Sequence, residues 1–245
     1  MTGQLRAELL KQRSTQTTLF LFLGMVGLVA LASALHVLAP SASSLASRNH
    51  QLQVFEVGTR IGMLFAALVG AMAITAEIRY GTIRPTFLVT PSRAPVLAAK
   101  LAVSALAGIL FGLLSEALMA GATTIALAAR GIDNQLTSGD YLQLLAGGTA
   151  AAALWAMIGL GVGALVRNQV ATLVGLCAWM LLVENLLLPF VPDAGRFTPG
   201  AAGLAVAGSL ADKLLAPAPA ALALLVYAAA LSVAGWLATL RRDVA

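Results

Sequence analysis

The chain has 245 residues, of which 60% are hydrophobic and 10% charged, and its formal net charge is +5. An ordinary soluble domain carries about 25% charged residues, so this composition excludes a soluble enzyme and is typical of an integral membrane protein. The basic balance is explained by loops that face an anionic inner leaflet, and it does not call for a nucleic-acid partner.

Six apolar stretches are long enough to cross a hydrocarbon core of about 30 Å, which takes about 20 helical residues. The loops between them are too short to fold as an independent soluble domain. A cleaved signal peptide is the alternative for the first stretch, but that stretch is longer than the usual apolar region of such peptides, and five more follow. The sequence therefore predicts an all-α polytopic membrane protein, a single domain over residues 1–245 with spans at 17–38, 55–75, 101–128, 142–166, 170–191 and 219–240.

Lys and Arg concentrate on one side of this arrangement. With the N-terminus inside, ten basic residues fall in inner segments, four fall in outer segments, and Arg60 falls within the second span. Cytoplasmic loops carry an excess of Lys and Arg. Both termini are therefore predicted to lie in the cytoplasm, and the protein in the cytoplasmic membrane.

The N-terminal segment, residues 5–13, places Leu5 and Leu9 one helical turn apart beside basic side chains. This pattern predicts an interfacial helix that lies in the headgroup plane before the chain enters the membrane. A positively charged anchor that only sets the topology is the other interpretation.

The inner loop after the second span is the most informative stretch. A simple connection takes about four to six residues, but this loop runs from residue 76 to residue 100 and contains Tyr80, Ile83 and Phe87. Apolar side chains of this kind in a charged loop favour a partner surface. The alternative is a short amphipathic helix that rests on the membrane.

The same loop resembles a known family. Glu77, the Gly81-Thr82-Ile83 triplet, Pro91-Ser92-Arg93 and Lys100 look like the first cytoplasmic loop of ABC-2 type transporter permeases. Residues 5–11 resemble the opening helix of that family, and the six-span layout is similar too.

The resemblance implies a cytoplasmic coupling helix between spans two and three that docks into a separate ATPase subunit. It also implies two ATPase copies and a second permease protomer, so that the permeases form a homodimer or a heterodimer. The residues that it assigns to the coupling loop are Glu77, Arg79, Tyr80, Gly81, Thr82, Ile83, Arg84 and Phe87.

The chain has no P-loop of its own. Such a loop needs Gly-Lys followed by Ser or Thr, whereas Lys11, Lys100 and Lys213 follow Leu, Ala and Asp. No cofactor is therefore expected in this chain, and ATP and Mg²⁺ are expected on the partner ATPase. Residues His36, His50 and Cys177 lack partners at ligand spacing, so no metal site is predicted either.

Pairs of glycines four residues apart occur in three spans: Gly58 and Gly62, Gly108 and Gly112, and Gly159 and Gly163. This spacing lets helix backbones approach closely, so these glycines predict tight helix packing. Residues 201–210 form an apolar run between spans five and six that is too short to cross the membrane. It predicts a short re-entrant or surface helix on the outer side.

Three ionisable residues, Arg60, Glu116 and Glu184, lie inside predicted spans. At about 1.5 Å of rise per residue, all three fall at one level, about 22 Å from the inner end of the membrane. A charge at that depth is costly and needs a partner. We therefore predict an intramembrane polar cluster in which Arg60 pairs with Glu116 or Glu184, or in which these residues line a substrate path.

Three functions fit the sequence. The first is a permease subunit of an ATP-driven exporter for a hydrophobic or amphipathic substrate. The second is an ion-gradient-driven secondary transporter that uses Glu116 and Glu184 as proton or ion sites. The third is a membrane scaffold or immunity protein that binds a partner.

Overall fold

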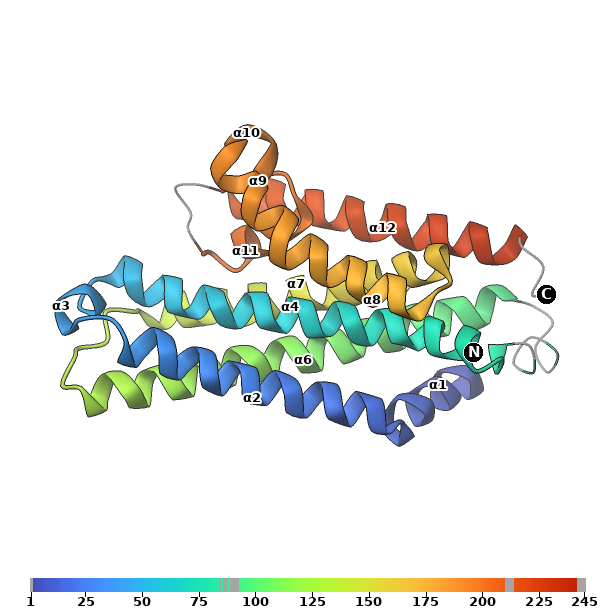
Figure 1. The fold of residues 1–245 in the computed structure, drawn as a ribbon, viewed down its shortest axis with the longest axis horizontal. Coiled ribbons are helices and arrows are strands. Elements are labelled where there is room, and N and C mark those ends of the chain that lie inside the picture. Colours follow the sequence, from blue (N-terminus) through green and yellow to red (C-terminus); the bar gives the residue numbers. More distant parts are fainter. Residues whose placement is uncertain (1, 84, 86–87, 89–92, 210–213, 242–245) are drawn as a thin grey trace.

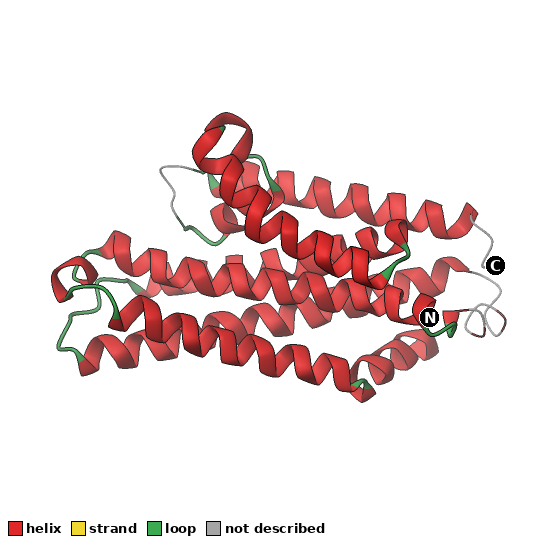
Figure 2. Ribbon diagram, in the orientation of Figure 1, coloured by secondary structure: helices red, strands yellow, loops and turns green. Residues whose placement is uncertain are grey.

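The computed structural model describes residues 2–83, 85, 88, 93–209 and 214–241, and within them the chain consists of helices joined by loops and turns, with no strand. This confirms the predicted all-α class (Figures 1 and 2). The elements are α1 (Thr2–Ser14), α2 (Gln16–Leu38), α3 (Ala42–Leu45), α4 (Arg48–Arg79), α6 (Arg93–Ala129), α7 (Ser138–Val166), α8 (Gln169–Ala178), the π-helix η1 (Trp179–Val183), α9 (Glu184–Phe190), α10 (Pro192–Gly195), α11 (Pro199–Val206) and α12 (Pro217–Arg241).

Six helices in the described ranges are long and apolar enough to cross a membrane, as predicted. They are α2, α4, α6, α7, the continuous run α8–η1–α9, and α12. The second and third spans are longer than predicted, because their helices continue into polar sequence. At the start of α4, for example, the side chain of Ser47 accepts a hydrogen bond from the backbone N–H of His50 and caps the helix.

The core of the bundle lies where α4, α6 and α7 pack against one another. α2, α12 and the α8–α9 run lie around this core (Figure 1) and expose many large apolar side chains, as helices facing hydrocarbon do. The α1 helix, the connection from α4 to α6 and the C-terminal end of α12 lie at the same end of the bundle. We call it the loop end.

The predicted glycine pairs are sites of close helix packing. Gly58 and Gly62 on α4 face Met119 and Ser115 on α6, and Gly159 and Gly163 on α7 face α4. A Cβ atom added at Gly159 would lie 2.0 Å from the carbonyl oxygen of Ala67. The three-helix core therefore depends on the absence of side chains at these positions.

Gly159→Ala is expected to destabilise the protein by about 1–3 kcal/mol, the usual cost of overpacking a well-packed core. The added methyl group would meet backbone, which cannot move aside without separating α7 from α4. Thermal unfolding of the purified protein in detergent measures the effect. Gly175→Ala on α8 is the control, because an added Cβ there has no neighbour within 4 Å, and an equal effect of both changes would contradict this explanation.

A short helix between spans five and six, α11, confirms the predicted element. Thr198 caps it by accepting a hydrogen bond from Ala201, and Pro199 occupies its first turn. Residues Pro199 to Ala205 are buried, and α11 packs against α12, α7 and α4. The helix therefore lies within the bundle, which favours the re-entrant interpretation over a surface helix. Residue 210, the end of the predicted run, lies outside the described residues.

Candidate functional site

A buried set of charged residues lies at the loop end, where three helices meet. Glu8 and Lys11 come from α1, Glu77 from the last turn of α4, and Lys100 from the second turn of α6. We call these four residues the charge network. Gly81, with φ of 71°, follows α4 directly, in a backbone conformation that glycine adopts readily. The network therefore lies beside the point where the chain leaves α4 for the α4–α6 connection.

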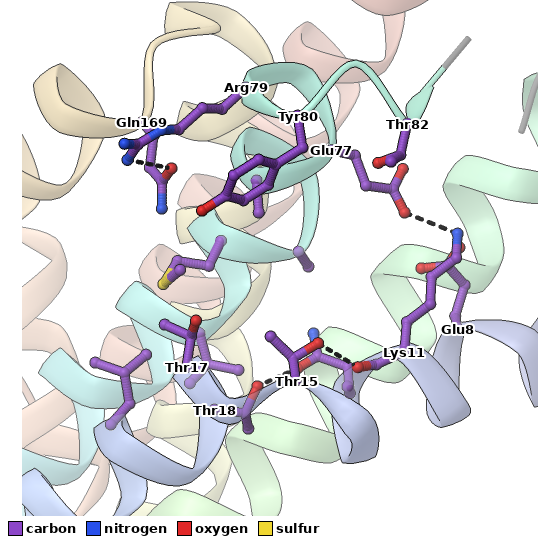
Figure 3. A pocket seen from close by; sticks show the side chains of 16 residues that line it. Glu8, Lys11, Thr15, Thr17, Thr18, Glu77, Arg79, Tyr80, Thr82 and Gln169 are labelled. Carbon is purple, nitrogen blue, oxygen red and sulfur yellow. Dashed lines mark hydrogen bonds and ion pairs between the residues drawn. The ribbon is translucent and has the colours of Figure 1, made fainter. Parts of the chain in front are cut away.

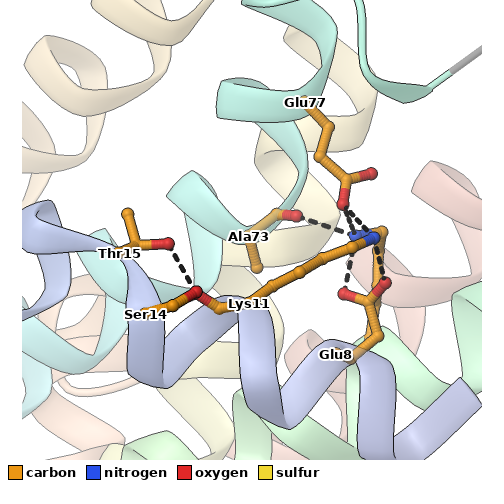
Figure 4. A network of polar contacts seen from close by, with 7 residues as sticks. Glu8, Lys11, Ser14, Thr15, Ala73 and Glu77 are labelled. Carbon is orange, nitrogen blue, oxygen red and sulfur yellow. Dashed lines mark hydrogen bonds and ion pairs between the residues drawn. The ribbon is translucent and has the colours of Figure 1, made fainter.

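Lys100 is the centre of the charge network, and Figure 4 shows the residues around it: Glu8, Lys11, Ala73 and Glu77. Its Nζ atom lies 2.8 Å from Oε2 of Glu8 and 2.7 Å from Oε1 of Glu77, and it donates a 3.1 Å hydrogen bond to the carbonyl oxygen of Ala73. Lys11 Nζ lies 2.8 Å from a carboxylate oxygen of Glu8 and 2.8 Å from one of Glu77. Each lysine thus joins the same two carboxylates.

The network is electrically balanced and mostly withdrawn from solvent. Lys100 is 1% exposed, Glu8 6% and Glu77 8%. Removing such charges from water costs several kcal/mol per ion, and the cost is offset when each charge has well-placed partners. Burial lowers the pKa of Lys11, but its hydrogen bonds to Glu77 and Glu8 outweigh burial, so the pKa of Lys11 is raised above its ordinary value. The network therefore holds α1, α4 and α6 together as one unit.

A pocket of about 630 Å³ lies next to the network, between the α1–α2 corner, α4 and the start of α8. Figure 3 shows Glu8, Lys11 and Glu77 on one side of it and Arg79, Tyr80 and Gln169 on another. The polar lining also includes Gln12, Thr82 and three threonines of the α1–α2 corner: Thr15, Thr17 and Thr18. The deeper lining is apolar.

Four of the predicted coupling-loop residues adjoin the network or the pocket. Glu77 belongs to the charge network, Arg79 donates a 3.2 Å hydrogen bond to Gln169, and Thr82 lines the pocket. Tyr80 also lines the pocket, and it is 72% exposed. These side chains present both charge and aromatic surface at the loop end.

The remaining predicted coupling-loop residues fall into two groups. Ile83 is 3% exposed and packs with Ile74, Leu97 and Leu160. It therefore anchors the connection to the bundle instead of offering a surface to a partner. Arg84 and Phe87 lie outside the described residues. Of the predicted coupling segment, about residues 77–87, the structure describes 77–83 and 85: residues 77–79 end α4, 80–82 form a turn, and 83 and 85 are helical.

The predicted ion pair between Arg60 and Glu116 or Glu184 is wrong. Arg60 instead pairs with Glu56, one turn earlier on α4, at 2.6 Å, and donates a 3.1 Å hydrogen bond to Asn185 on α9. Arg60 thus reaches α9 beside Glu184, whereas Glu116 lies against Gly148 of α7. Successive side chains on a helix point about 100° apart, so equal depth does not bring two groups together.

The two buried glutamates occupy separate places. Glu184, 7% exposed, accepts a 2.9 Å hydrogen bond from the backbone N–H of Gly200 and a 2.7 Å one from Trp179 Nε1. Glu116, 2% exposed, lies against Gly148 of α7 and near the hydroxyl of Thr59, but neither of its oxygens makes a hydrogen bond of normal geometry within the described residues. Arg60 therefore lies near Glu184, through the neighbouring Asn185, without a direct ion pair to it, and Glu116 is held at a different helix contact.

Sequence reasoning missed four charged residues as parts of a site. Glu56 carried a local signal, since an acid four residues before Arg60 on a helix is an ordinary pair. Glu8, Lys11 and Lys100 appeared only as parts of the family-like segments, and the pairing of Glu8 with Lys100 joins positions 92 residues apart. No local pattern reports a contact at that separation.

Within the described ranges, no group of three or more His, Cys, Asp or Glu side chains is placed to hold a metal ion. The described chemistry of the loop end is therefore that of ion pairs, hydroxyl groups and an aromatic ring.

Comparison with known proteins identifies the family of this chain. A family model described as ABC-2 family transporter protein matches residues 4–183, which include the charge network, the first four spans and most of the fifth. A search of curated proteins finds no match to this chain.

Proposed function

Because the chain belongs to the ABC-2 transporter family, and is therefore the permease component of an ABC transporter, we propose that it serves an ATP-driven exporter. In this proposal two permease protomers, identical or different, work with two copies of a separate ATPase subunit. ATP and Mg²⁺ bind to the ATPase, and the loop end with both termini faces the cytoplasm.

The charge network is the observation that carries the proposal. It fixes α1 and the start of α6 to the end of α4, directly beside the connection that the family resemblance assigns to ATPase docking. Tyr80 and Leu88 of that connection are 72% and 81% exposed, so they are available to a partner. A force applied to the connection would reach two long spans at once, because α4 and α6 are joined through Lys100.

The proposed mechanism is alternating access. Closure of the ATPase subunits moves the α4–α6 connection, the rigid core of α4, α6 and α7 transmits this movement, and a cavity between protomers opens outward. A hydrophobic or amphipathic substrate fits the apolar character of the spans.

A secondary transporter driven by an ion gradient is the second candidate, and the burial of Glu116 without a hydrogen bond of normal geometry in the described residues favours it. A buried carboxyl group of this kind is a usual element of proton relays. In that case Glu116→Gln would abolish transport, while changes at Tyr80 would be tolerated.

Affinity purification of the tagged protein from native membranes tests the proposal. We expect a P-loop protein to be recovered in equal amount and the complex to hydrolyse ATP. Repeated recovery of the permease without any P-loop partner, together with transport that depends on an ion gradient, would favour the secondary transporter.

A further inference from the structure

We propose that the pocket at the α1–α2 corner binds the headgroup of an anionic phospholipid. The pocket, about 630 Å³, has the size of ordinary small-molecule sites. It lies at the loop end, where α1 meets the first span, and so at the level of the lipid headgroups. The lipid belongs to the inner leaflet if the loop end faces the cytoplasm, so the choice of leaflet rests on the orientation proposed above.

The charge of the lining favours an anion. Glu8 and Glu77 line the pocket, but Lys11 and Lys100 balance them within the charge network. Arg79 is the surplus cation. Its described hydrogen-bond acceptor is the neutral amide oxygen of Gln169, and within the described residues it forms no ion pair.

The positions of the side chains suit a phosphate group. Arg79 carries donors on a planar fork that matches phosphate oxygens. Thr17 and Thr18 line the pocket from α2, across from Arg79 and Tyr80 (Figure 3). The Thr18 hydroxyl already donates a 3.3 Å hydrogen bond to Oε1 of Gln12, so the Thr17 hydroxyl is the one that can donate to a phosphate oxygen. The guanidinium and the Thr17 hydroxyl thus lie on opposite walls of a single pocket.

The depth of the pocket favours a lipid over a free phosphate ion. Leu21 lies about 7 Å further into the membrane than the start of α2, and Val69 lies about 15 Å deeper than Arg79; both line the pocket, as does Met72. The polar mouth and the apolar floor match the headgroup and the first part of the acyl chains. Next to the pocket, α2 and α8 expose Leu19 and Val170 to hydrocarbon.

Lipid titration of the purified full-length chain in a non-ionic detergent tests the assignment. The probes are dioleoylphosphatidylglycerol, dioleoylphosphatidylcholine and glycerol 3-phosphate, and the readouts are the melting temperature and native mass spectrometry. We expect phosphatidylglycerol to raise the melting temperature and to remain bound. Phosphatidylcholine and glycerol 3-phosphate should do neither, because the first lacks net negative charge and the second lacks acyl chains.

Three variants locate the site. Arg79→Gln should weaken the apparent affinity for phosphatidylglycerol about tenfold or more, the effect of losing a charge-assisted hydrogen bond. Thr17→Val, which keeps the shape of the side chain, should weaken the affinity for phosphatidylglycerol about fivefold, the effect of losing one ordinary hydrogen bond. Arg13→Gln should leave this affinity unchanged. The substitution removes the same charge from the same end of the bundle, but Arg13 does not line the pocket.

Equal weakening by Arg79→Gln and Arg13→Gln would overturn the proposal, since it would show general attraction to a basic surface. Stabilisation by glycerol 3-phosphate as strong as that by the lipid would also overturn it, in favour of a small-anion site. Binding is measured on the permease alone, so failure here leaves the exporter proposal standing, and loss of the ATPase partner leaves the lipid site standing.

Discussion

Lys100→Met is expected to lower the free energy of unfolding by about 3–5 kcal/mol, the cost of removing one partner from a buried ion pair. Methionine fills a similar volume, so the loss comes from charge. Glu8 and Glu77, both buried, would share the single remaining cation, Lys11. At about 2–4 °C per kcal/mol for a chain of this size, the melting temperature should fall by about 6–20 °C.

Two further variants separate charge from packing. Lys11→Met removes the same charge from a side chain that is 44% exposed, so it should cost much less. Glu8→Gln combined with Lys100→Met restores the balance of charges and should recover part of the loss. Equal melting temperatures for Lys100→Met and Lys11→Met, or no recovery in the double variant, would show that the network does not stabilise the loop end as described.

Tyr80→Ala is expected to leave the fold intact and to uncouple the permease from its ATPase. Tyr80 is 72% exposed, so its removal should change the melting temperature little. An aromatic side chain central to an interface contributes about 2 kcal/mol or more to binding, so the affinity for the ATPase should fall about thirtyfold. Titration of the ATPase onto the purified permease measures this, and transport should be lost in parallel.

Tyr227→Ala is the matched control for Tyr80→Ala. Tyr227 is 37% exposed and lies on α12, away from the α4–α6 connection. It should leave both ATPase affinity and transport unchanged. If Tyr80→Ala binds the ATPase as tightly as the unchanged protein does, Tyr80 is not part of the docking surface.

The spans and the glycine contacts could be predicted because their signals are local. A run of apolar residues and a spacing of four between glycines each describe one helix, and α4, α6 and α7 pack through the surfaces that these patterns mark. The length of this helix was underestimated: the predicted span covers residues 55–75, whereas α4 begins at Arg48, before Phe55, and reaches Arg79.

The charged contacts could not be predicted in the same way, because depth along a helix can be counted from the sequence and direction around the bundle cannot. Arg60 and Glu116 share a level, yet Arg60 bonds to α9 and Glu116 lies against α7. The contacts of the charge network could not be predicted for the same reason. Lys11 and Glu77 are 66 residues apart, and they meet because α1 folds back along the loop end.

Chemical labelling of an introduced cysteine tests the central claim, that the α4–α6 connection faces the cytoplasm and can meet an ATPase. Leu88→Cys, in a Cys177→Ser background, places a thiol at a position that is 81% exposed. Asp193→Cys, whose parent side chain is 96% exposed, lies between spans five and six, in the segment predicted to face outward, and serves as the control. With a membrane-impermeant maleimide, we expect intact cells to label position 193 and to leave position 88 unlabelled until the membrane is opened. Labelling of position 88 in intact cells would place the connection outside and contradict the account.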